Sequence, residues 1–263
     1  MPLKNKKYLL TKLEQQLLNH LPDKAVVSLH SIRSIRVVNS HSLLTMLHRL
    51  GKKGFVIRLS RGRYYITKDR TYSRLAVGSN LTTNAYIGLE SALFVYGAIK
   101  SVPLETYVVT DRKSASARSI NNDRYILVPF GKLALGYSPM GDYRISSMGK
   151  TLFDCLYRIR YVDHVESLVD LVNLMGDNDL SDFLYFALKY GSTALLERAG
   201  YIISLSQGSR YGHAKKAIKI IESRIGKGVV TKLRQGSPFD TKQYVKRWHI
   251  YDNIGLENAT RRL

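Results

Sequence analysis

Short polar and basic side chains recur at helical spacing near residue 45. Ser42, Thr45 and Arg49 fall on one side of a helix at 100° per residue, and Lys52 continues that side. Hydroxyl and guanidinium groups placed in this way can hydrogen-bond to base edges in the major groove of DNA. The residues of this segment that we predict to contact DNA are His41, Ser42, Thr45, Arg49, Lys52 and Lys53.

Arginines follow in the next dozen residues, around a segment that favours a tight turn. Residues 55–59 and 63–67 are rich in β-branched and aromatic side chains, and a Ser-Arg-Gly sequence connects them. We predict a β-hairpin whose basic tip binds phosphates or enters the minor groove. The arginines of this tip are Arg58, Arg61 and Arg63.

The acidic residues form no catalytic pattern with the expected spacing. A nucleotidyltransferase needs a Gly-Ser pair followed closely by two acids one residue apart, which hold Mg²⁺ beside a nucleotide phosphate. Gly191-Ser192 is not followed by such a pair, and we interpret Asp177 and Asp179 as a solvated turn in which Asp179 caps a helix. We therefore predict no catalytic residue, metal site or cofactor. A nuclease is an alternative interpretation, in which Glu105, Asp111 and Lys113 would form the metal-dependent site.

The formal net charge of +21 is concentrated at the two ends of the chain. Residues 1–70 hold 15 Lys/Arg against three acids, residues 71–204 hold 13 against 13, and residues 205–263 hold 13 against four. Because clustered cations gain DNA affinity by releasing counterions, this distribution favours a polyanionic partner for the ends. The apolar runs are shorter than the roughly 18 residues of a membrane span, and no signal peptide is recognisable, so we expect a cytosolic protein without a membrane partner.

Three helices are predicted before the hairpin. Leucines spaced three, four and four residues apart predict a helix from Tyr8 to about Leu21. Ser28 is expected to cap a short second helix, and Asn39 or Ser40 a third that runs to Lys53 with its leucines turned inward. Three helices followed by a basic hairpin indicate a winged helix-turn-helix over residues 1–72.

The rest of the chain is predicted to be mixed at first and then helical. We expect a packed helix over residues 82–99, strands over residues 105–110 and 124–130 with a polar stretch between them, and a loop over residues 131–141. Further helices are predicted over residues 148–159 behind a Ser147 cap, 165–175, 180–190 and 193–199. The fold class is therefore α+β, with a winged helix-turn-helix followed by a mixed α/β, largely helical C-terminal domain over residues 80–263.

A second basic face lies in the C-terminal portion, residues 205–263. Lysines and an arginine alternate there with apolar residues at helical spacing, so one face packs and the other is cationic. This cationic face can extend the DNA contact, bind an RNA or an acidic protein surface, or face solvent. Its residues are Lys215, Lys216, Lys219 and Arg224.

Four segments, taken in order, resemble AbiEi-family antitoxins. Residues 85–97 are similar to the tyrosine-started helix that follows the winged helix in that family, and residues 150–156 to its threonine-leucine-aspartate helix. Residues 195–202 resemble its arginine-glycine-tyrosine segment, and residues 247–253 its closing tryptophan-to-asparagine strand. The order and spacing fit over about residues 8–253. The chain departs from the family after Asp154, where residues 160–164 replace an expected Gly-Gly turn.

The resemblance implies a two-domain antitoxin and transcriptional repressor of an abortive-infection toxin-antitoxin pair. Its partners would be double-stranded promoter DNA, bound by a homodimer or cooperatively, and a nucleotidyltransferase-like toxin. The resemblance implies that the C-terminal domain counteracts the toxin, and it leaves open whether the two proteins touch. The alternatives are a transcription regulator with a sensor domain and a metal-dependent nucleic-acid enzyme delivered by the winged helix.

Overall fold

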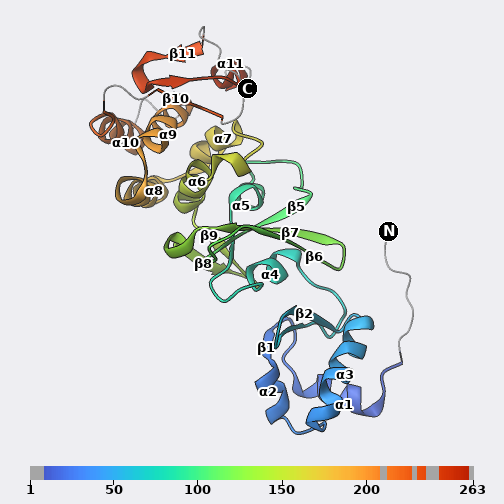
Figure 1. The fold of residues 1–263 in the computed structure, drawn as a ribbon. Coiled ribbons are helices and arrows are strands. Elements are labelled where there is room, and N and C mark those ends of the chain that lie inside the picture. The colour runs from blue at the N-terminus through green and yellow to red at the C-terminus, as the bar shows by residue number, and fades with distance from the viewer. Residues whose placement is uncertain (1–8, 208–211, 227–229, 235–242, 261–263) are drawn as a thin grey trace.

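The computed structural model describes residues 9–207, 212–226, 230–234 and 243–260 (Figure 1). The N-terminal part contains three helices and a three-stranded antiparallel sheet with the order β1-β3-β2. Its elements are α1 (Lys12–His20), β1 (Val26–Ser28), α2 (Leu29–Ser34), α3 (Ser40–Lys52), β2 (Val56–Ser60) and β3 (Arg63–Ile66). This arrangement is the winged helix-turn-helix predicted from the sequence.

Side-chain caps fix where the first two helices begin. The Thr11 hydroxyl accepts a hydrogen bond from the Glu14 amide at 3.3 Å, and the Glu14 carboxylate accepts one from the Thr11 amide at 2.8 Å. Because this capping box satisfies two backbone donors at once, α1 begins at Lys12 rather than at Tyr8, which lies outside the described residues. Ser28 caps α2 as predicted, accepting from the Ser31 amide at 2.9 Å.

The small sheet contains one strand more than the predicted hairpin. β2 and β3 pair as predicted and turn at Arg61 and Gly62, where the φ of Gly62 is +74°. β1 adds to the other side of β3, with Val26 opposite Tyr65. A three-residue strand carries too little alternation to be recognised in the sequence, and its pairing with β3 is a contact between distant residues.

A six-stranded mixed sheet, in the order β6-β7-β5-β4-β9-β8, forms the centre of the second part. β5 pairs with β7, and β4 with β9, in parallel. Neighbouring side chains point to opposite faces. Thus Ile87 and Val108 pack with the helix α4, and Tyr86 and Val109 with the helix α5. The elements are α4 (Arg74–Ser79), β4 (Tyr86–Ile87), α5 (Leu89–Val95), β5 (Glu105–Thr110), β6 (Ser116–Ile120), β7 (Asp123–Pro129), β8 (Tyr137–Met140) and β9 (Tyr143–Ser146).

The helix predicted over residues 82–99 is a strand followed by a shorter helix. Tyr86 and Ile87 pair with β5, and Ile87 also pairs with β9, so two neighbouring strands supply the hydrogen bonds that a helix would otherwise make. The polar stretch after β5 likewise contains β6. The β6–β7 hairpin turns at Asn121 and Asn122, whose φ angles of 48° and 72° suit a two-residue turn with both central residues left-handed. The loop predicted over residues 131–141 contains the whole of β8.

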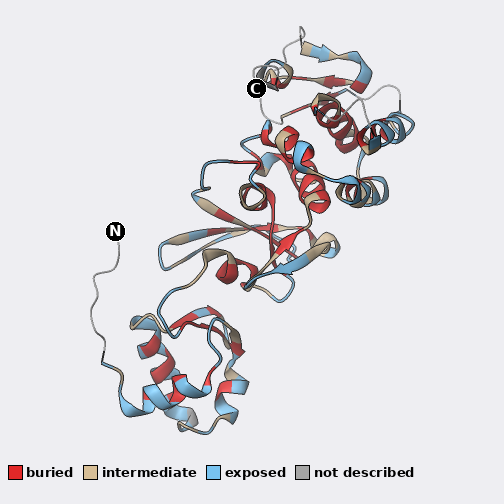
Figure 2. Ribbon diagram, turned by 180° about the vertical axis from the view of Figure 1, so that it is seen from behind, coloured by how far each residue is buried: buried red, intermediate tan, exposed pale blue. Residues whose placement is uncertain are grey.

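Helices and a small sheet complete the second part (Figure 2). Ser147 caps α6 as predicted, but α8 begins earlier than predicted, and Asp179 sits in its first turn, where its carboxylate accepts from the Gly176 amide at 2.9 Å. The elements are α6 (Met148–Tyr157), α7 (Ser167–Leu174), α8 (Asp177–Tyr190), α9 (Thr193–Leu205), α10 (Gly212–Glu222), β10 (Thr231–Lys232), β11 (Tyr244–Val245), β12 (Ile250–Tyr251) and α11 (Leu256–Thr260). Across the described ranges, no helix combines the length and the apolar character needed to cross a bilayer.

Candidate nucleic-acid interface

α3 presents a polar and basic face to solvent. Leu43, Leu47 and Leu50 are buried, as their spacing predicts, and Leu44 stays half exposed. Neither Arg49 nor Lys52 forms an ion pair with another described residue, so both cations remain available to a ligand. The side chains exposed on this face are His41, Ser42, Thr45, Arg49 and Lys52.

Lys53 differs from the other predicted contacts because it has a partner inside the winged helix. Its ammonium group lies 2.6 Å from a carboxylate oxygen of Glu14 and 3.0 Å from the Leu9 carbonyl oxygen. Glu14 is 1 % exposed. Burial alone would raise the pKa of Glu14, but hydrogen bonds from Lys53 and Thr11 outweigh it and hold the pKa below the ordinary 4.5. Lys53 therefore fastens α3 to the start of α1.

Replacing Lys53 with Met is expected to lower the free energy of unfolding by about 1.5 to 3 kcal/mol at pH 7, because it removes a charged hydrogen bond from a buried carboxylate. Since the folded-state pKa of Glu14 is depressed, this stabilisation is present above pH 4.5 and is lost as the pH falls below it. Urea titrations at pH 7 and pH 4 measure both effects. Lys52→Met is the matched control and should change stability little; an equal loss in the two variants would contradict the assignment.

The three wing arginines occupy different positions. Arg61 is exposed in the turn, and the Gly62 carbonyl accepts from the Leu29 amide at 2.7 Å, which ties the wing to the start of α2. Arg58 is exposed on β2. Arg63 is half buried, and burial together with the nearby Arg144 of β9 lowers its pKa. The structure thus leaves Arg58 and Arg61 open to a ligand and places Arg63 beside the second part of the chain.

The outer face of the winged-helix sheet is docked on the central sheet. Val56, Tyr64 and Ile66 pack with the three helices, whereas Ile57, Leu59 and Tyr65 join the cluster that holds α4 and β7. Two hydrogen bonds reinforce this contact. Arg118 donates to the Leu59 carbonyl at 2.8 Å, and the Tyr72 hydroxyl donates to Asp123 at 2.9 Å. The sequence pattern predicts an alternating strand here but not what covers its second face.

The C-terminal basic face is separate from the winged helix. Ala217, Ile218 and Ile221 are buried on one side of α10, as predicted, and the cations lie on the exposed side or just beyond the helix. α10 and α3 lie at opposite ends of the molecule in Figure 1, so the two basic regions do not form one continuous surface. The exposed residues of this second region are Lys215, Lys216, Lys219 and Arg224.

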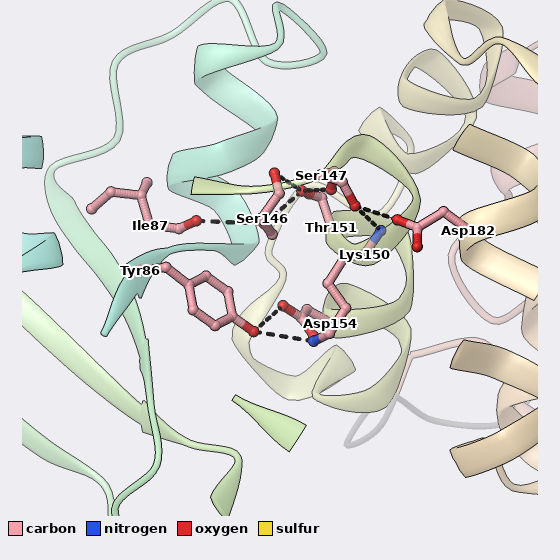
Figure 3. A network of polar contacts seen from close by, with 8 residues as sticks. All are labelled: Tyr86, Ile87, Ser146, Ser147, Lys150, Thr151, Asp154 and Asp182. Carbon is pink, nitrogen blue, oxygen red and sulfur yellow. Dashed lines mark hydrogen bonds and ion pairs between the residues drawn. The ribbon is translucent and has the colours of Figure 1, made fainter. Parts of the chain in front are cut away.

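A buried polar network joins β4 of the central sheet to α6 (Figure 3). No sequence pattern predicted it. The Tyr86 hydroxyl donates to Asp154 at 2.9 Å, and the Lys150 ammonium donates to the Tyr86 oxygen at 3.1 Å and forms an ion pair with Asp154. None of the three side chains is exposed. Four aromatic rings surround the ammonium, each with its centroid 5.1 to 5.6 Å away, and they belong to Tyr86, Phe130, Phe153 and Phe186.

The network has perturbed protonation equilibria, but no substrate can reach it in this conformation. Burial raises the pKa of Asp154 to about 6, although Lys150 and Tyr86 both act to lower it. Burial also raises the pKa of Tyr86. Perturbed pKa values often mark active sites, yet ion pairs that only hold a fold show them as well. Because Lys150 and Asp154 have no exposed surface, we assign the network to the stability of the fold.

The acids considered for a nuclease do not meet. Glu105 is the first residue of β5 and forms an ion pair with Arg124 at 3.0 Å. Asp111 follows the last residue of the same strand and accepts from Asn84 at 2.9 Å. Six residues of extended chain place the two acids roughly 20 Å apart at about 3.3 Å per residue. Within the described ranges, no three His, Cys, Asp or Glu side chains gather as metal ligands would.

A second buried contact joins α9 to the C-terminal sheet. The Trp248 ring lies directly over Gly200, so closely that a Cβ on Gly200 would be 2.0 Å from the ring atom Cζ3. Trp248 donates to Ser204 at 3.1 Å, and the Tyr201 hydroxyl donates to Asp252 at 2.7 Å. The four segments of the family resemblance therefore pack in pairs, the first two through Tyr86, Lys150 and Asp154 and the last two through this contact.

The fold defines the class of the molecule, a winged helix-turn-helix docked on a second part that contains a mixed sheet and helices. No family model and no curated protein matches the sequence. Among solved structures, the chain is similar to the RV2827C protein from Mycobacterium tuberculosis, with a TM-score of 0.62 at 12 % identity over 96 % of this chain and 94 % of that one. At this identity the likeness shows the fold.

Proposed function

We propose that the chain is a DNA-binding transcriptional repressor and the antitoxin of a toxin-antitoxin pair. The observation that carries the DNA-binding part is the exposed face of α3 beside the wing. Ser42, Thr45 and Arg49 would reach base edges in the major groove, and Arg61 a phosphate or the minor groove. The net charge of +12 on residues 1–70 supports this partner, because each phosphate contact releases counterions.

The antitoxin part of the proposal rests on the resemblance to the AbiEi family. The resemblance implies that the chain counteracts a nucleotidyltransferase-like toxin. The segments that carry the resemblance are mostly buried, and we take them to build the frame of the second domain. The surface that acts against the toxin would therefore be found among other residues.

The decisive measurement is a mobility shift of the purified full chain with its own upstream DNA and with a scrambled duplex of equal length, across a salt series. A repressor prefers the upstream DNA at physiological salt, and its affinity for both duplexes falls steeply as salt rises. Equal binding to the two duplexes at every salt concentration would overturn the repressor proposal.

Substitutions on the interface should separate specificity from affinity. Arg49→Ala is expected to lower discrimination between the two duplexes by about 1 to 3 kcal/mol, the value of a good contact to a base edge. Arg61→Ala should weaken binding to both alike and reduce the salt slope by about 1. Lys132→Ala is the control, because it removes one exposed positive charge just after the C-terminal end of β7, away from the winged helix. If it weakened binding as much as Arg61→Ala, net charge alone would explain the affinity.

One full-length variant should separate transcriptional repression from the neutralisation of the toxin. Arg49→Ala combined with Arg61→Ala should lose repression of a reporter placed behind the upstream DNA. The same variant should still rescue growth when it is co-expressed with the toxin-like gene of its operon, because the substitutions lie outside the second domain. Loss of rescue by a folded variant would contradict this division of labour.

A further inference from the structure

A pocket of about 580 Å³ lies between the winged helix and the second domain. One wall is the side of α3, a second is the hairpin β2–β3, and the third is the end of the β6–β7 hairpin. The pocket therefore exists only because the winged-helix sheet is docked on the central sheet. The hydrogen bonds of Arg118 to Leu59 and of Tyr72 to Asp123 hold these walls together.

The lining of the pocket combines apolar and cationic groups. Leu44, Val56 and Ile120 contribute apolar surface, while Lys52 and Arg58 contribute positive charge. His48 and Asn121 add two further nitrogen-bearing side chains to the lining. No acidic residue lines the pocket, and within the described ranges no ion pair engages Lys52 or Arg58.

This combination selects a particular kind of ligand. A bare inorganic anion would meet the cations but leave the apolar walls uncovered, and a neutral apolar molecule would leave the cations without a counter-charge. The volume falls within the roughly 300 to 1,000 Å³ of small-molecule sites. The α3 residues that line the pocket are centred about a quarter turn or more around the helix from Ser42, Thr45 and Arg49, and Lys52 lies at the border between the two faces. A ligand in the pocket therefore does not need to occupy the face that we assign to base edges.

We propose that this pocket binds a small amphipathic anion, an aromatic or aliphatic body that carries one carboxylate, sulfonate or phosphate group. The anionic group pairs with Lys52 and Arg58, and the body packs against Leu44, Val56 and Ile120. Lys52 and Arg58 are also predicted DNA contacts. If the proposed function holds, a ligand that neutralises both cations also weakens DNA binding. The concentration of a metabolite would then control the affinity of the winged helix for DNA.

The test uses the dye 8-anilinonaphthalene-1-sulfonate with the full chain in the absence of DNA. We expect saturable, blue-shifted fluorescence with one site per chain. The neutral analogue N-phenyl-1-naphthylamine should bind at least about tenfold more weakly, since it lacks the group that pairs with the cations. Absence of saturable binding, or equal binding of the two dyes, would overturn an anion site.

A matched pair of variants locates the dye. Leu44→Glu introduces a negative charge at the pocket, and Leu174→Glu introduces the same charge on α7; the two leucines are 50 % and 51 % exposed in the native chain. Leu44→Glu should weaken dye binding about tenfold or more and Leu174→Glu should leave it unchanged. Equal effects of the two substitutions would place the dye elsewhere and refute the pocket.

A separate arm tests the coupling to DNA. Saturating dye should lower the affinity of the wild-type chain for its upstream duplex, and the effect should disappear in Leu44→Glu. Dye binding at the pocket without any specific DNA binding would refute the repressor proposal and keep the anion site. Specific DNA binding that the dye leaves unchanged would keep the repressor and refute the coupling.

Discussion

Replacing Lys150 with Met is expected to lower the free energy of unfolding by about 3 to 5 kcal/mol, the cost of leaving one member of a buried ion pair without its partner. Asp154 would lose its ion pair with the Lys150 ammonium group. Of these two partners, only the Tyr86 hydroxyl would still donate a hydrogen bond to the carboxylate. The aromatic cage would still accept the apolar Met side chain, so packing changes little. Urea unfolding at pH 8, followed by circular dichroism, measures the loss.

The loss should depend on pH in a defined direction. The folded-state pKa of Asp154 is about 6, above its ordinary 3.8, and removing Lys150 raises it further. A raised carboxyl pKa means that the folded state binds more protons than the unfolded state, so stability falls as the pH rises from about 4 towards the folded-state pKa. Lys150→Met should therefore be less destabilised at pH 5 than at pH 8.

A double variant provides the control for this network. Lys150→Met with Asp154→Asn removes both charges and keeps an oxygen acceptor for Tyr86. It should recover most of the lost stability, because replacing a whole buried pair costs far less than breaking it. A double variant as unstable as Lys150→Met alone would mean that the ion pair is not the source of the effect.

Truncating Trp248 to Ala should cost about 3 to 5 kcal/mol. Its ring is 1 % exposed, fills the space above Gly200 and carries the hydrogen bond to Ser204. Neighbouring helices cannot close a cavity of this size without losing their own contacts, so both the transfer and the cavity contributions are lost. Circular dichroism during thermal unfolding measures the effect, since the chain has a single Trp and the variant has no tryptophan fluorescence.

The close contact with Gly200 can be tested by a double-mutant cycle. In the native chain Gly200→Ala would place a methyl group into the Trp248 ring and should cost about 1 to 3 kcal/mol, with a shift in the fluorescence of that tryptophan. In the Trp248→Ala background the methyl group enters vacated space, and the higher helix propensity of Ala makes the change neutral or stabilising. Equal costs in both backgrounds would show that the ring does not restrict this position.

Local patterns predicted most of the winged helix and many of the later elements. The leucine spacing of α3, the Ser28 and Ser147 caps and the glycine turn of the wing act over three or four residues, so the sequence alone contains the information. Residues 82–99 show the limit of such patterns. Tyr86 has helical spacing to the residues after it, yet the pairing of Tyr86 and Ile87 with β5, and of Ile87 with β9, makes this segment a strand.

Some features of the candidate site likewise follow from local sequence patterns, and others depend on the tertiary structure. The sequence determined the exposed face of α3, because the positions of its buried leucines fix which side chains point outward. The tertiary structure decided that Lys53 is paired with Glu14, that Arg63 lies beside Arg144, and that a pocket forms where the β6–β7 hairpin reaches α3. Periodicity says which side of an element is buried. What covers that side depends on contacts between residues far apart in the chain, and for those the sequence carries no local signal.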